Sequence, residues 1–464
     1  MHSRKLRPAG TGRAMLVALA GCALAGTAAL SGCSASSPAG GGSGGGGSLP
    51  QSKNAHATGD LTVWIRGAGD SPKAYRKIFD AFTAQSGIKV NIATATLTDF
   101  ETKLTAAASA HRLPDVVFDD AAQLGNFESQ GIILPIDKAK FAGADQLTDL
   151  AWKSATDLHG QPYAVPFSAQ ANVLLIRKDW LDKVGLQPPK TWDELARVAK
   201  AFTTQDPDGD GKADTYGLDV PGSTARGYTS WYWSSFLYQA GGDFVKSAGN
   251  GKYTATVDTP QAVQSAQFLE NQVCTAKDVQ PSVLGDDTTA TNKAFQTGVA
   301  GIYLTGPYAY ATMDATTVKG KYIVIAPPAG PTGTAATLAE GTDIFTMADA
   351  KTDEATKLEE FMITPQAQQL GMTGVKTATV VRLPVNKNVD AATVHSGDQR
   401  WQVAQQVYAD AGHYEWDNLP NWTALRQKAS EELNKLLSSC GDTQSALTTL
   451  NSDLNSVLRQ QGVG

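Results

Sequence analysis

The alternation of apolar and polar residues predicts an α/β fold that begins near residue 60. Residues 61–65 form a β-rich run, and the next apolar side chains follow the i, i+3, i+4, i+7 spacing of one helix face: Tyr75, Ile78, Phe79 and Phe82. Gly87 ends this helix, and residues 88–92 alternate as a second strand, with a third over residues 116–118. The order strand, helix, strand predicts a parallel sheet with crossover helices.

Helix signals recur through the rest of the chain. Thr191 and Glu194 have the spacing of a capping box in front of an apolar helical stripe. Thr259 and Thr364, each followed by proline, mark two further helix starts. Residues 421–458 have the pattern of a helical hairpin interrupted at residues 439–442. Because the whole body is too long for one ordinary core, its length predicts two domains.

The first 32 residues have the pattern of a secretory signal. Four basic residues precede an apolar run over residues 14–30: Arg4, Lys5, Arg7 and Arg13. The run ends in Leu-Ser-Gly-Cys33, which resembles the bacterial lipoprotein motif, in which the sulfur of the cysteine carries a diacylglyceryl group. Cleavage at Cys22 would leave too short an apolar core. The alternative to a lipoprotein signal is a single transmembrane anchor, and the run of 17 residues is at the lower limit of length for crossing a bilayer.

We therefore expect a signal peptide over residues 1–32, a lipid on Cys33 and a Gly/Ser-rich flexible tether over residues 33–59. This arrangement would hold the protein at the extracellular face of the cell membrane. Of the four cysteines, Cys274 and Cys440 then remain, and an exported pair predicts a disulfide, with two separate buried thiols as the alternative.

Charge excludes some partners. The chain has 39 basic and 45 acidic residues, and loss of the signal removes only basic ones. An acidic chain without Lys/Arg clusters argues against nucleic-acid binding and against an electrostatic membrane-binding face.

Aromatic residues gather near turns, beside glycine or proline. They are Trp64, the run Trp231-Tyr232-Trp233, Tyr308 with Tyr310, and Trp422. Sugars present flat C–H faces ringed by hydroxyls, so sites for them combine aromatic rings with polar side chains. Core packing is the alternative for each ring, and the clustering alone does not decide between the two.

Six short segments occur in the order found in one known family. They are residues 63–67, 114–118, 160–166, 177–181, 188–195 and 306–310. Over residues 61–458 the chain resembles the extracellular solute-binding proteins of carbohydrate ABC importers, especially bacterial maltodextrin-binding proteins. The resemblance implies a two-lobe periplasmic-binding-protein-like fold with a multi-strand hinge and a ligand cleft. The first lobe would span residues 60–167 and about 345–395, and the second about 170–342 and about 396–464.

The resemblance also implies a function and a set of ligand-binding residues. We expect a monomer that binds a mono- or oligosaccharide and delivers it to permease subunits. The implied ligand-binding residues are Trp64, Arg66, Asp70, Asp119, Asp120, Gln170, Trp231, Trp233, Tyr308, Tyr310, Glu340 and Trp422. Trp233 lies eight residues before Gly241-Gly242, as a sugar-stacking aromatic does in maltodextrin binders.

Two departures from the family pattern affect the ligand. Tyr308 and Tyr310 stand where the maltodextrin binders have tryptophans, and Gln170 stands where the family often has a carboxylate. A glutamine donates as well as accepts hydrogen bonds, which changes the pattern that a ligand must match. The resemblance therefore supports a carbohydrate ligand in general more strongly than maltodextrin in particular. The same fold would bind a glycerol phosphodiester only with a basic cluster in the cleft, and the sequence places only Arg66 near the loops.

An enzyme is not expected. The chain lacks the Gly-x-Ser-x-Gly and His-Glu-x-x-His motifs. The remaining alternative is a lipid-anchored glycosidase using Asp119 and Asp120. Neighbours on a strand point to opposite faces, which does not suit the flanking carboxylates of that reaction.

A possible calcium loop lies in the middle of the chain. Asp206, Asp208, Asp210 and Asp214 occupy positions 1, 3, 5 and 9 of an EF-hand-like spacing, with glycine at position 6. Position 12 is Gly217 in place of a bidentate glutamate, and the alternative is an Asp/Gly turn capped by its own side chains. No cofactor is expected to be required.

The lipoprotein interpretation predicts the location of a single-residue variant. Cys33→Ala removes the acceptor sulfur, so the protein should move from the membrane fraction into the soluble fraction. Fractionation followed by immunoblotting measures this. A mutant that stays membrane-bound, beside unprocessed wild type, would identify a transmembrane anchor instead.

Overall fold

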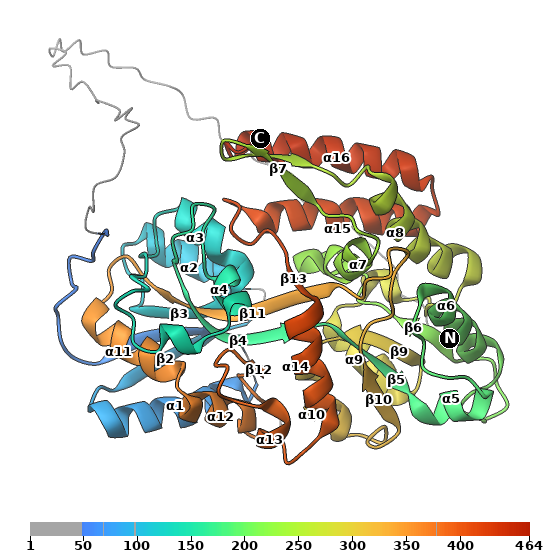
Figure 1. Ribbon diagram of the computed structural model, residues 1–464, viewed down its shortest axis with the longest axis horizontal. Helices are drawn as coiled ribbons and strands as arrows, with labels where there is room; N and C mark the ends of the chain where they lie inside the picture. Colours follow the sequence, from blue (N-terminus) through green and yellow to red (C-terminus); the bar gives the residue numbers. More distant parts are fainter. Residues whose placement is uncertain (1–48, 68, 97–98, 377) are drawn as a thin grey trace, which may run out of the picture. The chain divides into compact units, whose positions relative to one another are not determined.

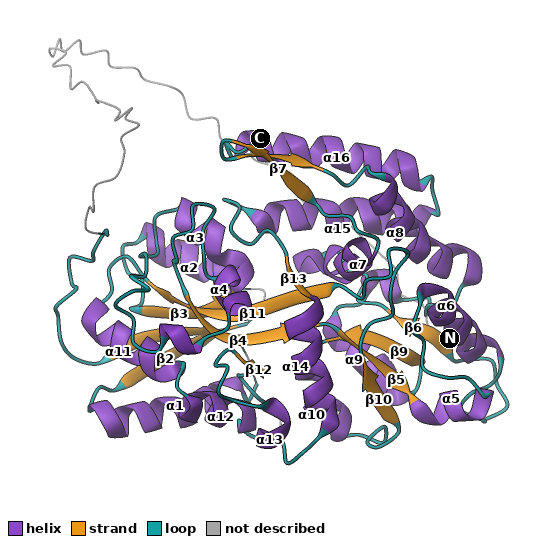
Figure 2. Ribbon diagram, viewed as in Figure 1, coloured by secondary structure: helices purple, strands orange, loops and turns teal. Residues whose placement is uncertain are grey.

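Two mixed β-sheets lie at the centres of two lobes in the part of the chain that the structure describes (Figures 1 and 2). The structure is a computed structural model that describes residues 49–464 except residues 68, 97–98 and 377. The predicted signal, Cys33 and the tether up to residue 48 lie outside the described residues. None of the helices described is long and apolar enough to cross a membrane.

The first lobe is built on the parallel strands that the sequence predicts. Its sheet has the order β12-β4-β11-β3-β1-β2, with β13 paired to β11. The strands are β1 (Leu61–Arg66), β2 (Val90–Ala95), β3 (Val116–Asp120), β4 (Val165–Ala171), β11 (Thr337–Thr346), β12 (Leu383–Pro384) and β13 (Gly412–Tyr414). β1 runs parallel to both β2 and β3, which confirms the predicted crossover arrangement.

Helices cover this sheet on both faces (Figure 2). They are α1 (Ser71–Ser86), α2 (Phe100–Ser109), α3 (Leu124–Ser129), α4 (Asp149–Ser154), α11 (Thr352–Met362), α12 (Pro365–Thr373), α13 (Ala391–Val394) and α14 (Gln399–Ala411). The predicted face of α1 is buried, and Gly87 ends the helix with a φ of 78° in the left-handed region that glycine adopts without a steric cost.

The second lobe has a smaller sheet with the order β10-β5-β9-β6. Its strands are β5 (Val173–Arg177), β6 (Tyr216–Asp219), β9 (Ala300–Thr305) and β10 (Tyr322–Ile325), and a separate hairpin joins β7 (Val245–Gly249) to β8 (Lys252–Ala255). The associated helices are α5 (Lys178–Val184), α6 (Trp192–Thr204), α7 (Tyr228–Gln239), α8 (Pro260–Glu270), α9 (Thr288–Thr297), α10 (Tyr310–Asp314), α15 (Trp422–Ser439) and α16 (Thr443–Gln460).

Helix caps form at the predicted positions. The Thr191 hydroxyl accepts from the Glu194 backbone N–H, while the Glu194 carboxylate accepts from the Lys190 N–H, one residue earlier than in a standard capping box. Thr259 and Thr364 cap α8 and α12. The predicted helical hairpin is α15 and α16, which lie side by side in Figure 1.

The hinge consists of strands that pass between the lobes. β4 leads through Asn172 directly into β5, and β11 pairs along its length with β4. β13, which pairs with the first residues of β11, carries the chain from α14 towards α15. Four side chains of α14 are buried in the larger hydrophobic core, which contains residues of both sheets: Trp401, Ala404, Val407 and Tyr408. The predicted lobe boundaries stay a prediction.

The folded body begins earlier than residue 60. Ser52 and Ala55 are buried, and Ala55 C=O accepts from the Asp353 N–H at the start of α11. Lys53 and His56 form ion pairs with Asp349 and Asp353. Residues 49–59, predicted as the end of a flexible tether, are therefore attached to the first lobe.

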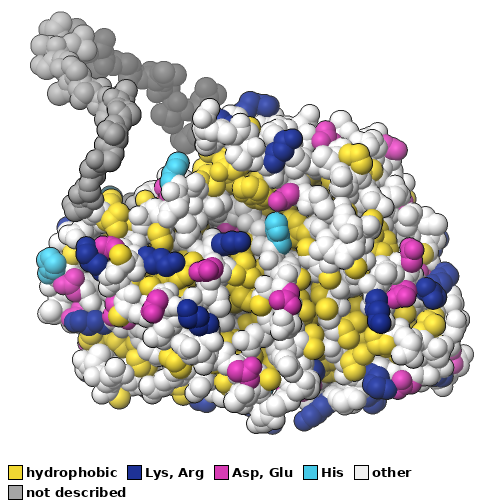
Figure 3. Space-filling model, in the orientation of Figure 1, with side chains coloured by type: hydrophobic (Ala, Val, Ile, Leu, Met, Phe, Trp, Pro, Cys, Tyr) yellow, Lys and Arg dark blue, Asp and Glu magenta, His cyan; other side chains and the backbone are white. Residues whose placement is uncertain are grey.

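The surface agrees with the charge composition. On the face shown in Figure 3, Lys/Arg and Asp/Glu side chains are interspersed. Interspersed charges give no extended field of one sign for a polyanion to bind.

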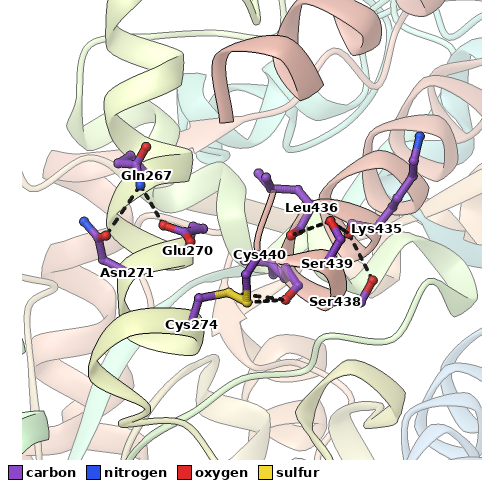
Figure 4. The surroundings of a disulfide bond; sticks show 10 residues. Gln267, Glu270, Asn271, Cys274, Lys435, Leu436, Ser438, Ser439 and Cys440 are labelled. Atoms are coloured by element: carbon purple, nitrogen blue, oxygen red, sulfur yellow. Dashed lines mark hydrogen bonds between the residues drawn. A yellow bond between two sulfur atoms is a disulfide. The ribbon is translucent and has the colours of Figure 1, made fainter. Parts of the chain in front are cut away.

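A disulfide joins Cys274 to Cys440, as the cysteine count predicts (Figure 4). Cys274 lies in the π-helical turn η4 (Asn271–Ala276) that follows α8, and Cys440 ends α15. The two cysteines are 166 residues apart in sequence, and the loop that the bridge closes includes β11 and the helices α11 to α14.

Removing this bridge should lower stability without changing ligand binding. A loop of this length restricts the unfolded chain, and losing such a restriction costs roughly 2–5 kcal/mol of unfolding free energy. Denaturant titration of the double variant Cys274→Ser/Cys440→Ser measures the loss, and intact mass with and without reductant should differ by two hydrogens. Two titratable thiols in the unreduced, unfolded protein would contradict the bridge.

Candidate functional site

A cleft of about 410 Å³ lies where both lobes meet the hinge. Its volume is within the roughly 300–1,000 Å³ typical of small-ligand sites. The first lobe contributes Arg66, Tyr75, Asp119, Asp120 and Arg382; the hinge contributes Gln170 and Glu340; the second-lobe side contributes Arg226, Tyr228, Trp231, Tyr308 and Arg426. Seven of the predicted ligand residues lie together here: Arg66, Asp119, Asp120, Gln170, Trp231, Tyr308 and Glu340.

Parallel pairing of β1 with β3 brings a cation and two carboxyl groups together. The register aligns Ile65 with Phe118, so Arg66 and Asp119 end neighbouring strands. Arg66 Nε lies 2.6 Å from Asp119 Oδ1, and Arg66 also forms an ion pair with Asp120. Ligands of open α/β sheets bind beyond the carboxyl ends of parallel strands, which is where this group lies.

The pKa values of the two aspartates move in opposite directions, because burial dominates at Asp119 and the nearby arginines dominate at Asp120. Burial raises the pKa of Asp119 to about 8, against the opposing charge of Arg66. Burial also acts to raise the pKa of Asp120, but Arg66 and Arg226 hold that pKa below its usual value. Asp119 Oδ2 is buried without a hydrogen-bond partner among the described residues. This oxygen is available to a ligand hydroxyl.

Gln170 and Glu340 are directly opposite each other on β4 and β11. Gln170 Nε2 donates to Glu340 Oε2 at 2.7 Å, and the Trp231 side chain also hydrogen bonds to Glu340. Burial raises the pKa of Glu340. Gln170 Oε1 has no partner among the described residues, so the floor of the cleft offers one more free acceptor.

Tyr308 lies against the same floor. It belongs to the short helix η6 (Pro307–Ala309), and its hydroxyl accepts from Thr305 at 2.7 Å. A Cβ on Gly306 would lie 2.9 Å from the Tyr308 ring and 3.0 Å from Gln170 Oε1. The glycine of the Gly-Pro-Tyr segment is therefore required by close packing beneath the ring.

Arg226 bridges the lobes across the cleft. It lies in η3 (Ala225–Gly227) of the second lobe, and its guanidinium is 3.2 Å from both Glu101 and Asp120 of the first. Its φ of 54° is in the left-handed region, which costs a non-glycine residue about 1 kcal/mol or more. The ion pairs across the cleft thus accompany a strained backbone.

The structure corrects the expected position of three aromatic residues. Trp233 is 0% exposed, and its Nε1 donates to Ser265 Oγ at 2.9 Å in the core of the second lobe. Trp422 is likewise 0% exposed and donates to Glu415. Tyr310 packs edge-on against Trp401 in the larger hydrophobic core. None of the three lines the cleft, because the helices that carry them turn these rings inward.

Two further predicted ligand residues lie outside the cleft. Trp64 is half-buried and packs edge-on against Phe100. Asp70 precedes α1 and forms an ion pair with Lys73 at 2.7 Å. Their loop still contributes Gly67 and Ser71 to the cleft wall.

Sequence reasoning missed several cleft side chains, among them Arg226, Tyr228, Arg382 and Arg426. Arg426 lies one helical turn after Trp422, and its Nε donates to Glu415 at 2.7 Å. Arg382 interrupts the apolar run Val380-Val381-Arg-Leu383, and a lone charge in such a run is the signal that would have identified it.

The predicted calcium loop meets the requirements only in part. Carboxylate oxygens of Asp206, Asp208 and Asp210 lie within 4.8 Å of one another, but Asp214 is not in this group. Lys212 Nζ lies 2.6 Å from Asp210, and backbone N–H groups of the loop donate to Asp206. Calcium takes six to eight oxygen ligands, so this donor set falls short. The calcium site stays a prediction.

The sequence matches one protein family over most of its length. The profile of the bacterial extracellular solute-binding proteins matches residues 68–369. The chain belongs to this family. Its members bind solutes rather than transform them, in line with the prediction of a non-enzymatic protein.

Known relatives share the fold. A binding protein of Brucella abortus (strain 2308) is 24% identical over 392 residues, covering 83% of this chain and 90% of that protein. The polygalacturonan/rhamnogalacturonan-binding protein YtcQ of Bacillus subtilis is 31% identical over 225 residues, covering 44% of this chain and 41% of that protein. The structure of maltose-bound MalE3 of T. maritima has a TM-score of 0.74 at 22% identity, covering 86% of this chain and all of that one. The predicted two-lobe binding-protein fold is confirmed.

Arg226→Gln should shift the lobes towards an open arrangement. Each partly exposed ion pair is worth about 0.2–1 kcal/mol, so losing two changes the closed-to-open ratio several-fold, more at low salt. Small-angle scattering of the ligand-free protein should give a larger radius of gyration. Arg459→Gln, an exposed arginine on α16, is the matched control. Equal radii for both variants would show that Arg226 does not hold the lobes together.

Proposed function

We propose that this protein is the lipid-anchored substrate-binding component of an ABC importer and that its ligand is a mono- or oligosaccharide. The observation that carries the proposal is the composition of the cleft. The cleft combines the aromatic rings of Trp231, Tyr228 and Tyr308 with Asp119 Oδ2 and Gln170 Oε1, which have no hydrogen-bond partner among the described residues. Rings suit the C–H faces of a sugar, and the oxygens suit its hydroxyls.

Binding would proceed by capture and closure. The hinge strands β4 and β11 supply the floor with Gln170 and Glu340, and each lobe supplies one wall. A ligand that contacts both walls favours the arrangement in which they are close, as in other hinge-closing proteins. The closed form would then dock onto permease subunits, and the protein would act as a monomer held at the extracellular face by the lipid on Cys33.

The relatives support a carbohydrate ligand. YtcQ is named for polygalacturonan and rhamnogalacturonan, and the MalE3 structure contains maltose. This chain has tyrosines where the maltodextrin binders have tryptophans, and Gln170 where the family often has a carboxylate. The identity, linkage and length of the sugar are therefore to be found by experiment.

A thermal-shift screen tests the proposal. A solute that binds only the folded state raises the melting temperature, by an amount that grows with its concentration relative to Kd. The panel should contain neutral and acidic oligosaccharides of one to six units, together with glycerol phosphodiesters. A shift with saccharides supports the proposal, and a shift only with phosphodiesters contradicts it.

Trp231 and Trp233 provide a matched pair of variants on one helix. Trp231→Ala should weaken binding of the saccharide with the largest shift by roughly 1–3 kcal/mol, about 5- to 150-fold, because it removes a ring from the cleft. Trp233→Ala should instead cost about 3–5 kcal/mol of stability, since it empties a site in the core.

Calorimetric titration and denaturant unfolding of both variants separate these effects. Weaker binding per folded molecule in Trp233→Ala, with Trp231→Ala unchanged, would reverse the assignment of the two rings.

A further inference from the structure

Four arginine side chains line the cleft, and three of them have carboxylate partners. Arg66 pairs with Asp119 and Asp120. Arg226 pairs with Asp120 and Glu101, and Arg426 with Glu415. The fourth arginine is Arg382. No carboxylate of the described residues lies within 4.0 Å of its guanidinium. Among the described residues, Arg382 is therefore the cleft arginine that forms no ion pair with a carboxylate.

Packing holds Arg382 in the cleft wall. Its backbone N–H donates to Ser168 Oγ at 2.9 Å, which fixes the residue beside β4 just before β12 begins. Its guanidinium lies 5.7 Å from the centre of the Tyr308 ring. Leu383, the next residue, is fully buried in the core of the first lobe. These contacts fix the backbone of Arg382 beside β4, from which its side chain reaches the cleft wall.

The Arg382 side chain is incompletely satisfied. Its Nε is buried and has no hydrogen-bond partner among the described residues. A buried donor without a hydrogen-bond partner is destabilising, and the contact of the cation with an aromatic ring offsets only part of that effect. A ligand atom that accepts a hydrogen bond from this guanidinium would remove the deficit.

The charge of Arg382 acts on the interior of the cleft. Burial raises the pKa of Tyr75, and Arg382 is the largest influence opposing that rise. Burial also acts to raise the pKa of Asp120, yet the four arginines together hold it below its usual value. Burial raises the pKa of Asp119 to about 8, against the opposing charge of Arg66. Four guanidinium groups thus act on the single carboxylate of Asp120.

We propose that the ligand is an acidic sugar, whose carboxylate or phosphate group is bound by Arg382 over the Tyr308 ring. This inference rests on the proposed function and narrows its substrate class. The planar guanidinium offers two parallel N–H donors to a carboxylate or phosphate, and charge-assisted bonds of this kind are stronger than neutral ones. Aromatic rings and neutral acceptors elsewhere in the cleft bind the uncharged part of the sugar.

Two pairs of probes, matched in sugar content within each pair, test the inference by calorimetric titration. The first pair is digalacturonate and neutral digalactose, and the second is galactose 1-phosphate and galactose. Wild type should bind the anionic member of one pair at least about tenfold more tightly than its neutral counterpart, more so at low salt. Whichever pair shows the preference identifies the carboxylate or the phosphate as the anion.

Variants locate the effect. Arg382→Gln should abolish the preference for the anionic probe, and Arg382→Lys should retain part of it. Arg112→Gln, an exposed arginine of the first lobe outside the cleft, is the control and should change neither affinity. Circular dichroism shows whether Arg382→Gln folds, and Arg382→Lys provides the comparison if it does not.

The outcomes separate this inference from the proposed function. Equal affinity for neutral and anionic probes, unchanged in Arg382→Gln, overturns the inference and leaves a receptor for neutral sugars. A preference that persists in Arg382→Gln also overturns it, because the anion then binds elsewhere. Failure of every saccharide to bind overturns the proposed function itself.

Discussion

The antiparallel pairing of β4 with β11 determines where everything else in the cleft can lie. β4 continues into β5 of the second lobe after one residue, and β11 carries the chain back into the first lobe. Their backbone hydrogen bonds make the floor of the cleft the part that moves least when the lobes move. Gln170 and Glu340 are cross-strand neighbours on this floor, so their hydrogen bond fixes the orientation of two side chains against which a ligand would rest.

The cation network depends on the floor and on the strand ends beside it. β3 pairs with β11 on one side and with β1 on the other, which places Asp120 between Arg66 and Arg226. The carboxylate of Asp120 thus forms ion pairs with an arginine of its own lobe and with an arginine of the opposite lobe. A ligand that competes for Asp120 changes the interaction between the lobes as well as its own affinity, so binding and closure are linked through this residue.

The pattern of neighbouring residues predicted the helices and strands well. It predicted poorly whether a given side chain points into the core or into the cleft. The apolar spacing of α1, the cap at Thr191 and the hairpin of α15 with α16 depend on neighbours in sequence, and all three are present. Trp231 and Trp233 are two residues apart, so on a helix they point to nearly opposite sides. Only packing against Ser265 and Phe244 decides which ring is core.

The missed residues have a similar cause. Arg226, Arg382 and Arg426 come from three segments that are distant in sequence, and nothing local places them together. The start of the folded body was misplaced because residues 49–59 are polar and look like linker. Their attachment is made by contacts with Asp349 and Asp353, nearly 300 residues later.

That N-terminal attachment determines how mechanical load would pass through the protein. Lys53, Ala55 and His56 hold the start of the body on α11 of the first lobe, and the load-bearing contacts do not cross the hinge. A pull on the chain upstream of Leu49 is therefore transmitted to the first lobe alone. Tension would neither open nor close the cleft, and the second lobe could swing while the point of attachment stays fixed.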